Sequence, residues 1–204
     1  HLDLGGWFRK LKDPILADFL RAWGRVVLEN QEQGYVVAEL SKLYQRQQKQ
    51  ISEHKGYLAE VYMAQVLWNM QRKTVPGGLF HQDKDVQFPD RFFYIRHRVR
   101  LGAGSGWEID VYASAGPDLW IGESKWWTQR KVGVQEVEDF WSKRPVVLEI
   151  EGELRSLSMW FFSSSGFSRE AQERMQELGM YWSDKQDLNR LLDLAGLRRL
   201  PEID

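Results

Sequence analysis

The chain of 204 residues contains no cysteine. This absence excludes disulfide bonds and zinc sites built on thiolates, and it is consistent with a cytoplasmic location, which we expect for the protein. Long apolar runs are missing too: none approaches the roughly 18 to 20 residues that a membrane-spanning helix needs. No signal-peptide pattern opens the chain. We therefore expect no association with a membrane.

A surplus of positive charge is also lacking, because 28 lysines and arginines stand against 29 aspartates and glutamates and give a net charge of −1. Any surface for nucleic acid must then come from local clustering. The chain does have apolar residues, at 43% hydrophobic and 13% aromatic, enough to bury a sizeable core in one domain with or without a helical appendage. It begins with His1 rather than Met, so we expect it to be part of a longer protein.

The first 55 residues predict a helical segment. In DPILADFLRAWGRVVLENQ, Asp13 is a candidate N-cap, Pro14 occupies the first helical position, and apolar residues recur at helical spacing. The stretch from Tyr35 to Lys73 predicts either one long helix or two in succession, with Gly56 opening the second. PGG at 76–78 is expected to end it.

Residues 56–204 predict a second, α/β domain. Strands are expected in RFFYIRHRVRL (91–101), WEIDVYA (107–113) and DLWIGESKWW (118–127), with a flexible turn at 102–106 and a four-residue SAGP loop joining the last two strands. Helices and strands then alternate: helix 132–143, buried strand 156–165, helix 168–179, short strand 180–184 and helix 184–196. For VVLEIEGEL, which follows Pro145, both a helix and an extended piece remain open. This order indicates a sheet flanked by helices.

Charged residues interrupt the two apolar strands of the predicted hairpin. If Ala113 lies opposite Asp118, strand alternation puts four charged side chains on one face and Ile109 and Val111 on the other. The charged set is Glu108, Asp110, Glu123 and Lys125. Clustered carboxylates repel one another unless a divalent cation or a raised pKa relieves them, and such oxygen-rich sites suit Mg²⁺ or Mn²⁺. A lysine two residues beyond a metal carboxylate can orient a water molecule or stabilise charge on a phosphate.

The motifs EID (108–110) and GESKWW (122–127) resemble the signature of the PD-(D/E)xK nucleases, the restriction-endonuclease-like superfamily. The similarity is greatest to the branch of methylated-DNA restriction enzymes and archaeal Holliday-junction resolvases. That family places an acidic residue on the helix before the sheet, and Glu60 matches it. A helix, a buried strand and a second helix follow the signature, as in the family, so the resemblance covers residues 56–194.

This resemblance implies a restriction-endonuclease-like core, a mixed central sheet flanked by helices, after the N-terminal helical segment. It also implies a Mg²⁺- or Mn²⁺-dependent nuclease that hydrolyses phosphodiester bonds, as an endonuclease on DNA. Asp110 and Glu123, with Glu60, would hold the metal, and Lys125 would position the attacking water. Oligomeric state stays open, with a homodimer as one candidate, because paired cuts in this superfamily usually need two active sites.

A second resemblance covers the front of the chain. LKDPILADFLRAWGRVV is similar to the segment that precedes the nuclease-like domain in archaeal-type AAA+ ATPases. No phosphate-binding G-x-x-x-x-G-K-[ST] loop occurs in these 204 residues, so the chain itself contains no such ATPase. An ATPase domain upstream is therefore a candidate partner.

Two alternatives stand beside the nuclease interpretation. Asp110, Glu123 and Lys125 could form a cross-strand salt-bridge ladder on a solvated face, with Glu60 an ordinary exposed helix residue. The chain could also be a non-catalytic nucleic-acid-binding or regulatory domain on the same fold. All three signature residues are present, which favours catalysis. The form of the nucleic acid, and any preference for sequence or methylation, stays open.

Basic residues near the signature are candidates for contacts to phosphates. One group is expected on a single strand face and another directly after the signature: Arg96, Arg98 and Arg100, with Arg91 and His97 nearby, and then Arg130 and Lys131. A solvated charge run is the alternative. His54 and His81 have no partner at metal-ligand spacing, so both are predicted to be surface residues.

Overall fold

We describe a computed structural model that covers residues 14–102 and 106–200. The chain divides into two compact units, His1–Ile51 and Ser52–Asp204. The candidate N-cap Asp13 and the middle of the turn expected at 102–106 lie outside the described residues. Among the described helices, none combines the length and apolar character that a membrane crossing needs.

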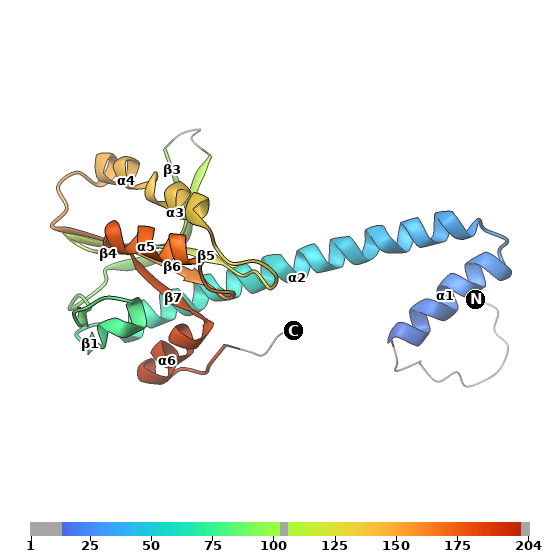
Figure 1. The fold of residues 1–204 in the computed structure, drawn as a ribbon, viewed down its shortest axis with the longest axis horizontal. Coiled ribbons are helices and arrows are strands. Elements are labelled where there is room, and N and C mark those ends of the chain that lie inside the picture. The colour runs from blue at the N-terminus through green and yellow to red at the C-terminus, as the bar shows by residue number, and fades with distance from the viewer. Residues whose placement is uncertain (1–13, 103–105, 201–204) are drawn as a thin grey trace. The chain divides into compact units, whose positions relative to one another are not determined.

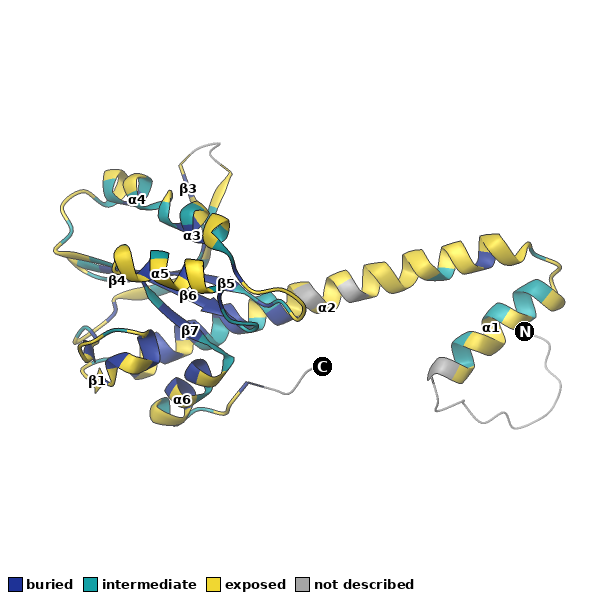
Figure 2. Cartoon of the chain, in the orientation of Figure 1, coloured by how far each residue is buried: buried dark blue, intermediate teal, exposed yellow. Residues whose placement is uncertain are grey.

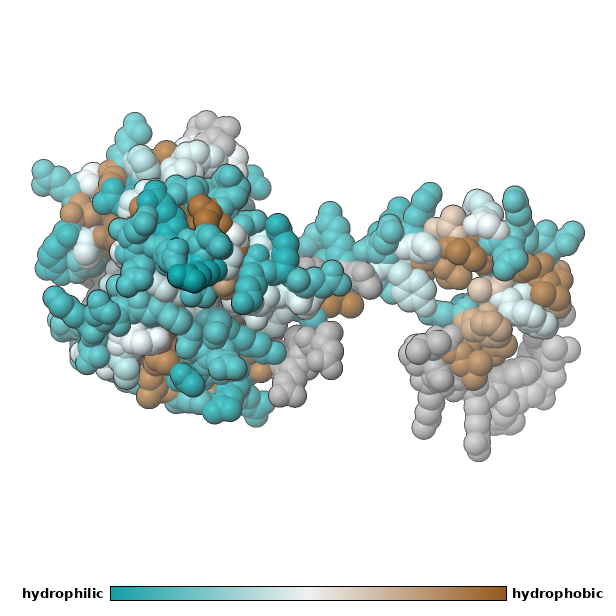
Figure 3. Space-filling view, viewed as in Figure 1, coloured by the Kyte–Doolittle hydropathy of each residue, from teal (hydrophilic) through white to brown (hydrophobic). Residues whose placement is uncertain are grey.

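The first unit contains α1 (Pro14–Val27) and the beginning of α2 (Gln33–Asn69). Polar contacts join the two helices within this unit: the Tyr44 hydroxyl donates to Asp18 over 2.8 Å, and Arg25 lies 2.6 Å from Glu39. Several large apolar side chains of the unit are exposed, among them Phe19, Trp23, Leu28, Tyr35 and Val37. Hydrophobic residues, drawn brown, gather on the visible surface of this unit (Figure 3).

Helix α2 is one continuous helix, which settles the alternative between one helix and two. It passes through Gly56 without a break and ends at Asn69, well before the PGG sequence expected to stop it. In the second unit its apolar residues, including Ala59, Met63 and Leu67, are fully buried. Glycine in a helix interior costs only about 0.5–1 kcal/mol relative to alanine, so this burial outweighs the weak helix propensity at position 56.

A five-stranded mixed sheet forms the centre of the second unit (Figure 1). In sheet order the strands are β3 (Tyr94–Leu101), β4 (Trp107–Ala115), β5 (Asp118–Lys125), β6 (Ser156–Ser163) and β7 (Tyr181–Asp184). Strand β4 is antiparallel to both β3 and β5, whereas β5, β6 and β7 run parallel to one another. A small two-stranded sheet precedes it, with a 3₁₀ helix between its strands: β1 (Thr74–Val75), η1 (Gly77–Phe80) and β2 (Val86–Gln87).

Helices make the parallel connections and complete the fold. They are α3 (Val134–Trp141) and α4 (Arg144–Glu151) between β5 and β6, α5 (Arg169–Glu177) between β6 and β7, and α6 (Lys185–Ala195) after β7. The segment left open in the sequence is thus helical, because Pro145 stands in the first turn of α4, where it needs no backbone donor. Ser168 caps α5 as predicted, accepting a hydrogen bond from the Ala171 amide.

Each face of the sheet carries its own hydrophobic core. Strand β6 shows why: Met159 and Phe161 pack with α3, α4 and α5, whereas Trp160 and Phe162 pack with α2 and α6. The alternate residues of this strand thus fill two different cores, so its middle, residues 159–162, is an unbroken apolar run. The strand is buried there, as predicted (Figure 2). The expected α/β architecture, a mixed central sheet flanked by helices, is confirmed.

The β4–β5 hairpin has a different register from the expected one. Ala115, not Ala113, lies opposite Asp118, so the loop is the two-residue turn Gly116–Pro117 rather than SAGP. The expected pairing of Ala113 with Asp118 is therefore wrong by two residues. A shift in register by an even number leaves unchanged which residues of the two paired strands share a face.

Gly122 provides a test of the packing between β5 and α2. A Cβ atom there would lie 2.8 Å from Met63 Cε and 3.2 Å from Val111 Cβ. We expect Gly122→Ala to lower the free energy of unfolding by about 1–3 kcal/mol, as other overpacked core positions do. Gly56→Ala is the matched control, because a Cβ at that position meets nothing within 4 Å. It should raise stability by about 0.5–1 kcal/mol. Chemical denaturation measures both, and equal effects of the two changes would contradict the packing described.

Candidate active site

The charged residues of the hairpin meet where β4 and β5 separate. Backbone pairing of the two strands ends at Val111 and Gly122. Beyond this pair the Asp110 carboxylate accepts hydrogen bonds from the Ser124 backbone amide at 2.8 Å and from its hydroxyl at 3.2 Å. Beyond the last backbone pair, the Asp110 side chain therefore joins the two strands. These hydrogen bonds fix Asp110 beside β5, the strand that carries Glu123.

At Asp110 the side chains of β4 stop alternating regularly between the two faces of the sheet. Ile109 packs in the core beside α3 and α5, but Val111 packs in the core beside α2, although strict alternation would put both on one face. The expectation that they share a face is therefore wrong. The neighbouring strand β3 is irregular at the same level, because Arg98, between the residues paired with Ile109 and Val111, has a φ of +52°.

Two ammonium groups hold the Glu123 carboxylate, which is only 7% exposed. Lys125 Nζ lies 2.6 Å from Oε1, and Lys143 Nζ lies 2.6 Å from Oε2. Lys143 comes from the residue directly before α4 and also donates to the backbone carbonyl of Glu108 over 2.6 Å. The sequence interpretation missed Lys143, because in the sequence it is one of many lysines near the end of a predicted helix.

The surroundings of this cluster shift the pKa values of Asp110 and Lys125. Burial, followed by repulsion from Glu123 and Glu60, raises the pKa of Asp110 to about 6, although the Ser124 amide opposes the rise. Burial acts to lower the pKa of Lys125, but the adjoining Glu123 carboxylate outweighs it and leaves that pKa above its usual value. Lys125 is thus a charged hydrogen-bond donor at neutral pH rather than a base.

Glu60 is buried on α2 and is not the solvated helix residue of the alternative interpretation. It is 4% exposed and accepts from Arg98 Nε at 3.0 Å and from Arg98 Nη2 at 3.0 Å. Its charge reaches Asp110, whose pKa it raises. Glu108 contributes its backbone carbonyl to Lys143, whereas its side chain lies 3.7 Å from exposed Arg100. The structure therefore brings Asp110, Glu123 and Lys125 together, with Glu60 nearby but paired to a guanidinium.

The predicted phosphate-contacting residues of β3 are all exposed. They are Arg96, Arg98 and Arg100, of which Arg98 also binds Glu60, and Arg91 precedes the strand. After the signature, the Arg130 guanidinium stacks 3.7 Å from the centre of the Trp127 ring and lies 3.2 Å from Glu136. Lys131 is exposed.

Asp110 and Glu123 are the candidate metal ligands of this cluster. Within residues 14–102 and 106–200, no group of three or more acidic or histidine side chains is arranged to hold a metal ion. Mg²⁺, however, is commonly held by one or two carboxylates, water and substrate phosphates. Asp110 and Glu123 supply two such carboxylates, and a cation beside Asp110 would counteract the burial and the repulsion from Glu123 that raise its pKa. The donor set fits a divalent ion bound by two carboxylates, with Glu60 held apart by Arg98.

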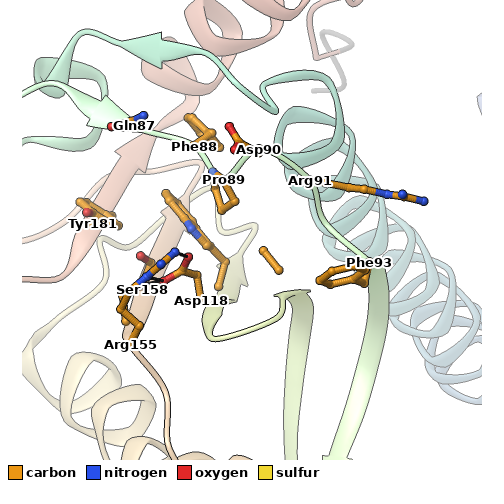
Figure 4. Close-up of a pocket in the computed structure, with 13 residues that line it drawn as sticks. Gln87, Phe88, Pro89, Asp90, Arg91, Phe93, Asp118, Arg155, Ser158 and Tyr181 are labelled. Atoms are coloured by element: carbon orange, nitrogen blue, oxygen red, sulfur yellow. Dashed lines mark hydrogen bonds and ion pairs between the residues drawn. The ribbon is translucent and has the colours of Figure 1, made fainter.

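A cavity of about 560 Å³ lies elsewhere in the second unit (Figure 4). Asp118 and Arg155, an ion pair, line it at the end of β5 opposite to Lys125. Three rings beside it are nearly parallel: Phe88 and Trp120 are 5.0 Å apart, and Trp120 and Tyr181 are 5.2 Å apart. This cavity is separate from the carboxylate–lysine cluster.

The two histidines expected at the surface differ from each other. His54 is exposed. His81 is partly exposed, but its ring stacks on Trp182 at 4.9 Å and its Nε2 lies 3.0 Å from Asp187 Oδ2. His81 therefore joins η1 to α6, a contact between residues 106 positions apart that the sequence could not reveal.

Comparisons with known proteins give two partial likenesses. No family model and no curated protein matches the chain. The crystal structure of a protein of unknown function, AF1548, is similar with 23% identity and a TM-score of 0.43, over 55% of this chain and 64% of that one. The structure of a repair endonuclease from Pyrococcus abyssi is similar with 14% identity and a TM-score of 0.35, over 47% and 39%. The chain thus spans less than two thirds of either protein. Likenesses this partial carry no conclusion about function, which is inferred from the site itself.

The raised pKa of Asp110 makes stability depend on pH. The Asp110 carboxyl group binds its proton more tightly in the folded state than in the unfolded state. The contribution of Asp110 to stability therefore falls as pH rises from about 4 to about 6. The rise from 3.8 to about 6 corresponds to about 3 kcal/mol at most. Asp110→Asn keeps an acceptor for Ser124 and does not ionise. It should match wild type near pH 4 and exceed its unfolding free energy above pH 6, measured by urea denaturation with a chelator present. A difference that does not vary with pH would refute this account.

Proposed function

We propose that the second unit is a Mg²⁺- or Mn²⁺-dependent nuclease of the PD-(D/E)xK type that hydrolyses phosphodiester bonds of DNA as an endonuclease. The observation that carries this proposal is the meeting of Asp110, Glu123 and Lys125 at the point where β4 and β5 separate, with hydrogen bonds of 2.6 to 3.2 Å to the two carboxylates. These are the residues that match the family signature in EID and GESK.

Burial argues against a simple salt-bridge ladder. A ladder on a solvated face leaves its carboxylates in water, with pKa values near their usual range. Here Glu123 is 7% exposed, and burial raises the pKa of Asp110 to about 6. Burying carboxylates in this way costs stability that apolar residues would not cost. Strongly shifted, clustered groups of this kind are typical of functional sites.

Different residues of the site would bind the metal ion and stabilise the transition state. Asp110 and Glu123 would bind the divalent ion, which when bound lowers the pKa of a coordinated water and neutralises charge on the scissile phosphate. Lys125, a charged donor, would orient the attacking water and stabilise the negative charge that develops on the phosphate oxygens. Glu60 would act through its charge on Asp110, because its own oxygens bind Arg98.

Exposed basic residues supply a surface for the DNA backbone. Arg96 and Arg100 on β3, together with Arg130 and Lys131 after β5, are exposed in the second unit. Such residues contact phosphates without reading the bases. The homodimer and the upstream ATPase domain stay predictions from the sequence.

Cleavage assays test the proposed reaction. Duplex, single-stranded and branched DNA, and RNA, are incubated with Mg²⁺ or Mn²⁺ and the purified chain. We expect cleavage that a chelator stops and that Lys125→Met lowers about 100- to 1000-fold, as loss of a donor to the transition state does. Asp83→Asn, which changes an exposed acid outside the site, is the control and should cleave like wild type. Equal cleavage by Lys125→Met and wild type would exclude this active site, and binding without cleavage would favour the non-catalytic domain.

Salt dependence tests the DNA surface separately. Each phosphate contact contributes about one unit to the slope of log affinity against log salt concentration. Arg96→Ala and Lys131→Ala should each weaken DNA binding and reduce that slope by about one. Lys73→Ala, which removes an exposed lysine beside β1, should leave the slope unchanged. Fluorescence anisotropy at several salt concentrations measures this, and unchanged slopes in both test variants would remove these residues from the interface.

A further inference from the structure

Lys143 is a second lysine of the candidate site, although it lies outside the sequence signature. Its side chain is only 14% exposed, and its Nζ donates to Glu123 Oε2 and to the Glu108 carbonyl, each at 2.6 Å. The ammonium also lies 5.7 Å from the centre of the Phe140 ring. These contacts hold a positive charge against one oxygen of the carboxylate that would bind the metal.

The two lysines balance the charge of the carboxylates. Lys125 and Lys143 each occupy one oxygen of Glu123, so two ammonium groups stand against the carboxylates of Asp110 and Glu123. The other nearby carboxylate, Glu60, is neutralised by Arg98. A divalent cation that enters this cluster meets little uncompensated negative charge, and repulsion by Lys143 opposes its binding.

A nucleic-acid phosphate changes that balance. An ammonium group buried to this extent needs a negative partner, because leaving it unpaired is strongly destabilising. When a cation binds Glu123, the ion pair between Glu123 and Lys143 is weakened. A phosphodiester oxygen can then become the negative partner of Lys143. Two simpler roles do not require the charge of Lys143. A neutral donor would be enough to bind the Glu108 carbonyl, and Lys125 by itself would neutralise Glu123.

We propose that Lys143 couples metal binding to nucleic-acid binding: its ammonium opposes the divalent ion at Glu123 until a phosphodiester of the substrate becomes its partner. This inference rests on the proposed nuclease function and makes Lys143 a positioning residue that acts through Glu123. Metal and DNA would then bind together more tightly than either binds alone, which is a coupling between two ligands.

Metal affinity without nucleic acid is the first test. Mn²⁺ is titrated into the chain while the free ion is followed by electron paramagnetic resonance. We expect Lys143→Met to bind Mn²⁺ about 5- to 150-fold more tightly than wild type, which is the usual range of coupling between sites. Lys143→Arg, which keeps the charge, and Lys84→Met, which removes an exposed lysine far from the signature in sequence, should bind like wild type. Lys143→Gln keeps a donor for the Glu108 carbonyl and replaces Lys143→Met if thermal melts show that variant to be unfolded.

The second test adds DNA. In a Lys125→Met background, in which cleavage is slowed, a 20-base-pair duplex should tighten Mn²⁺ binding, and adding Lys143→Met should abolish most of that gain. Asp110→Ala shows which hypothesis fails. If Asp110→Ala abolishes Mn²⁺ binding but Lys143→Met binds no more tightly than wild type, the coupling role is wrong and the metal site stands. If neither wild type nor Lys143→Met binds Mn²⁺, the metal-dependent nuclease itself is refuted.

Discussion

The burial of Asp110 and Glu123 beside each other is the constraint on which the rest of the site depends. Two like charges in a sheet of apolar residues are costly unless every oxygen finds a donor or a cation. Ser124 supplies donors to Asp110, and Lys125 and Lys143 each supply an ammonium to Glu123. These donors come from the end of β5 and from the residue before α4, so the geometry of the site requires the strand and the crossover helices to be in place together.

The two cores make that geometry rigid. Apolar residues of β5 and β6 alternate between the helices on the two faces, so the strand that carries Glu123 and Lys125 is packed from both sides. Gly122 allows Met63 of α2 to approach β5 closely, one residue before Glu123. The same helix carries buried Glu60, whose ion pair with Arg98 adds a third carboxylate near the site without adding net charge.

The proposed chemistry rests on local charge rather than on the overall balance of the chain. A net charge of −1 gives no general attraction to nucleic acid, yet exposed arginines on β3 and after β5 lie on the strands and loops that carry the site. The partial likenesses to solved structures leave the reaction open. The distinction between an enzyme and a binding domain therefore depends on whether the buried carboxylates hold a metal ion and whether Lys125 acts on the phosphate.

The sequence by itself determined the features that depend on near neighbours. Helical spacing, Ser168 as a cap and the apolar run of β6 predicted most elements and the mixed sheet between helices, because periodicity reports which face of an element is buried. Asp110, Glu123 and Lys125 were predicted to share a face, and they meet because the error in hairpin register was an even number of residues. Only the tertiary structure decided what depends on distant segments. Arg98 binds Glu60, Lys143 reaches Glu123 from 20 residues away, and the positive φ of Arg98 accompanies the change of face between Ile109 and Val111. These contacts follow from how helices pack on the sheet, and no local pattern of residues encodes them.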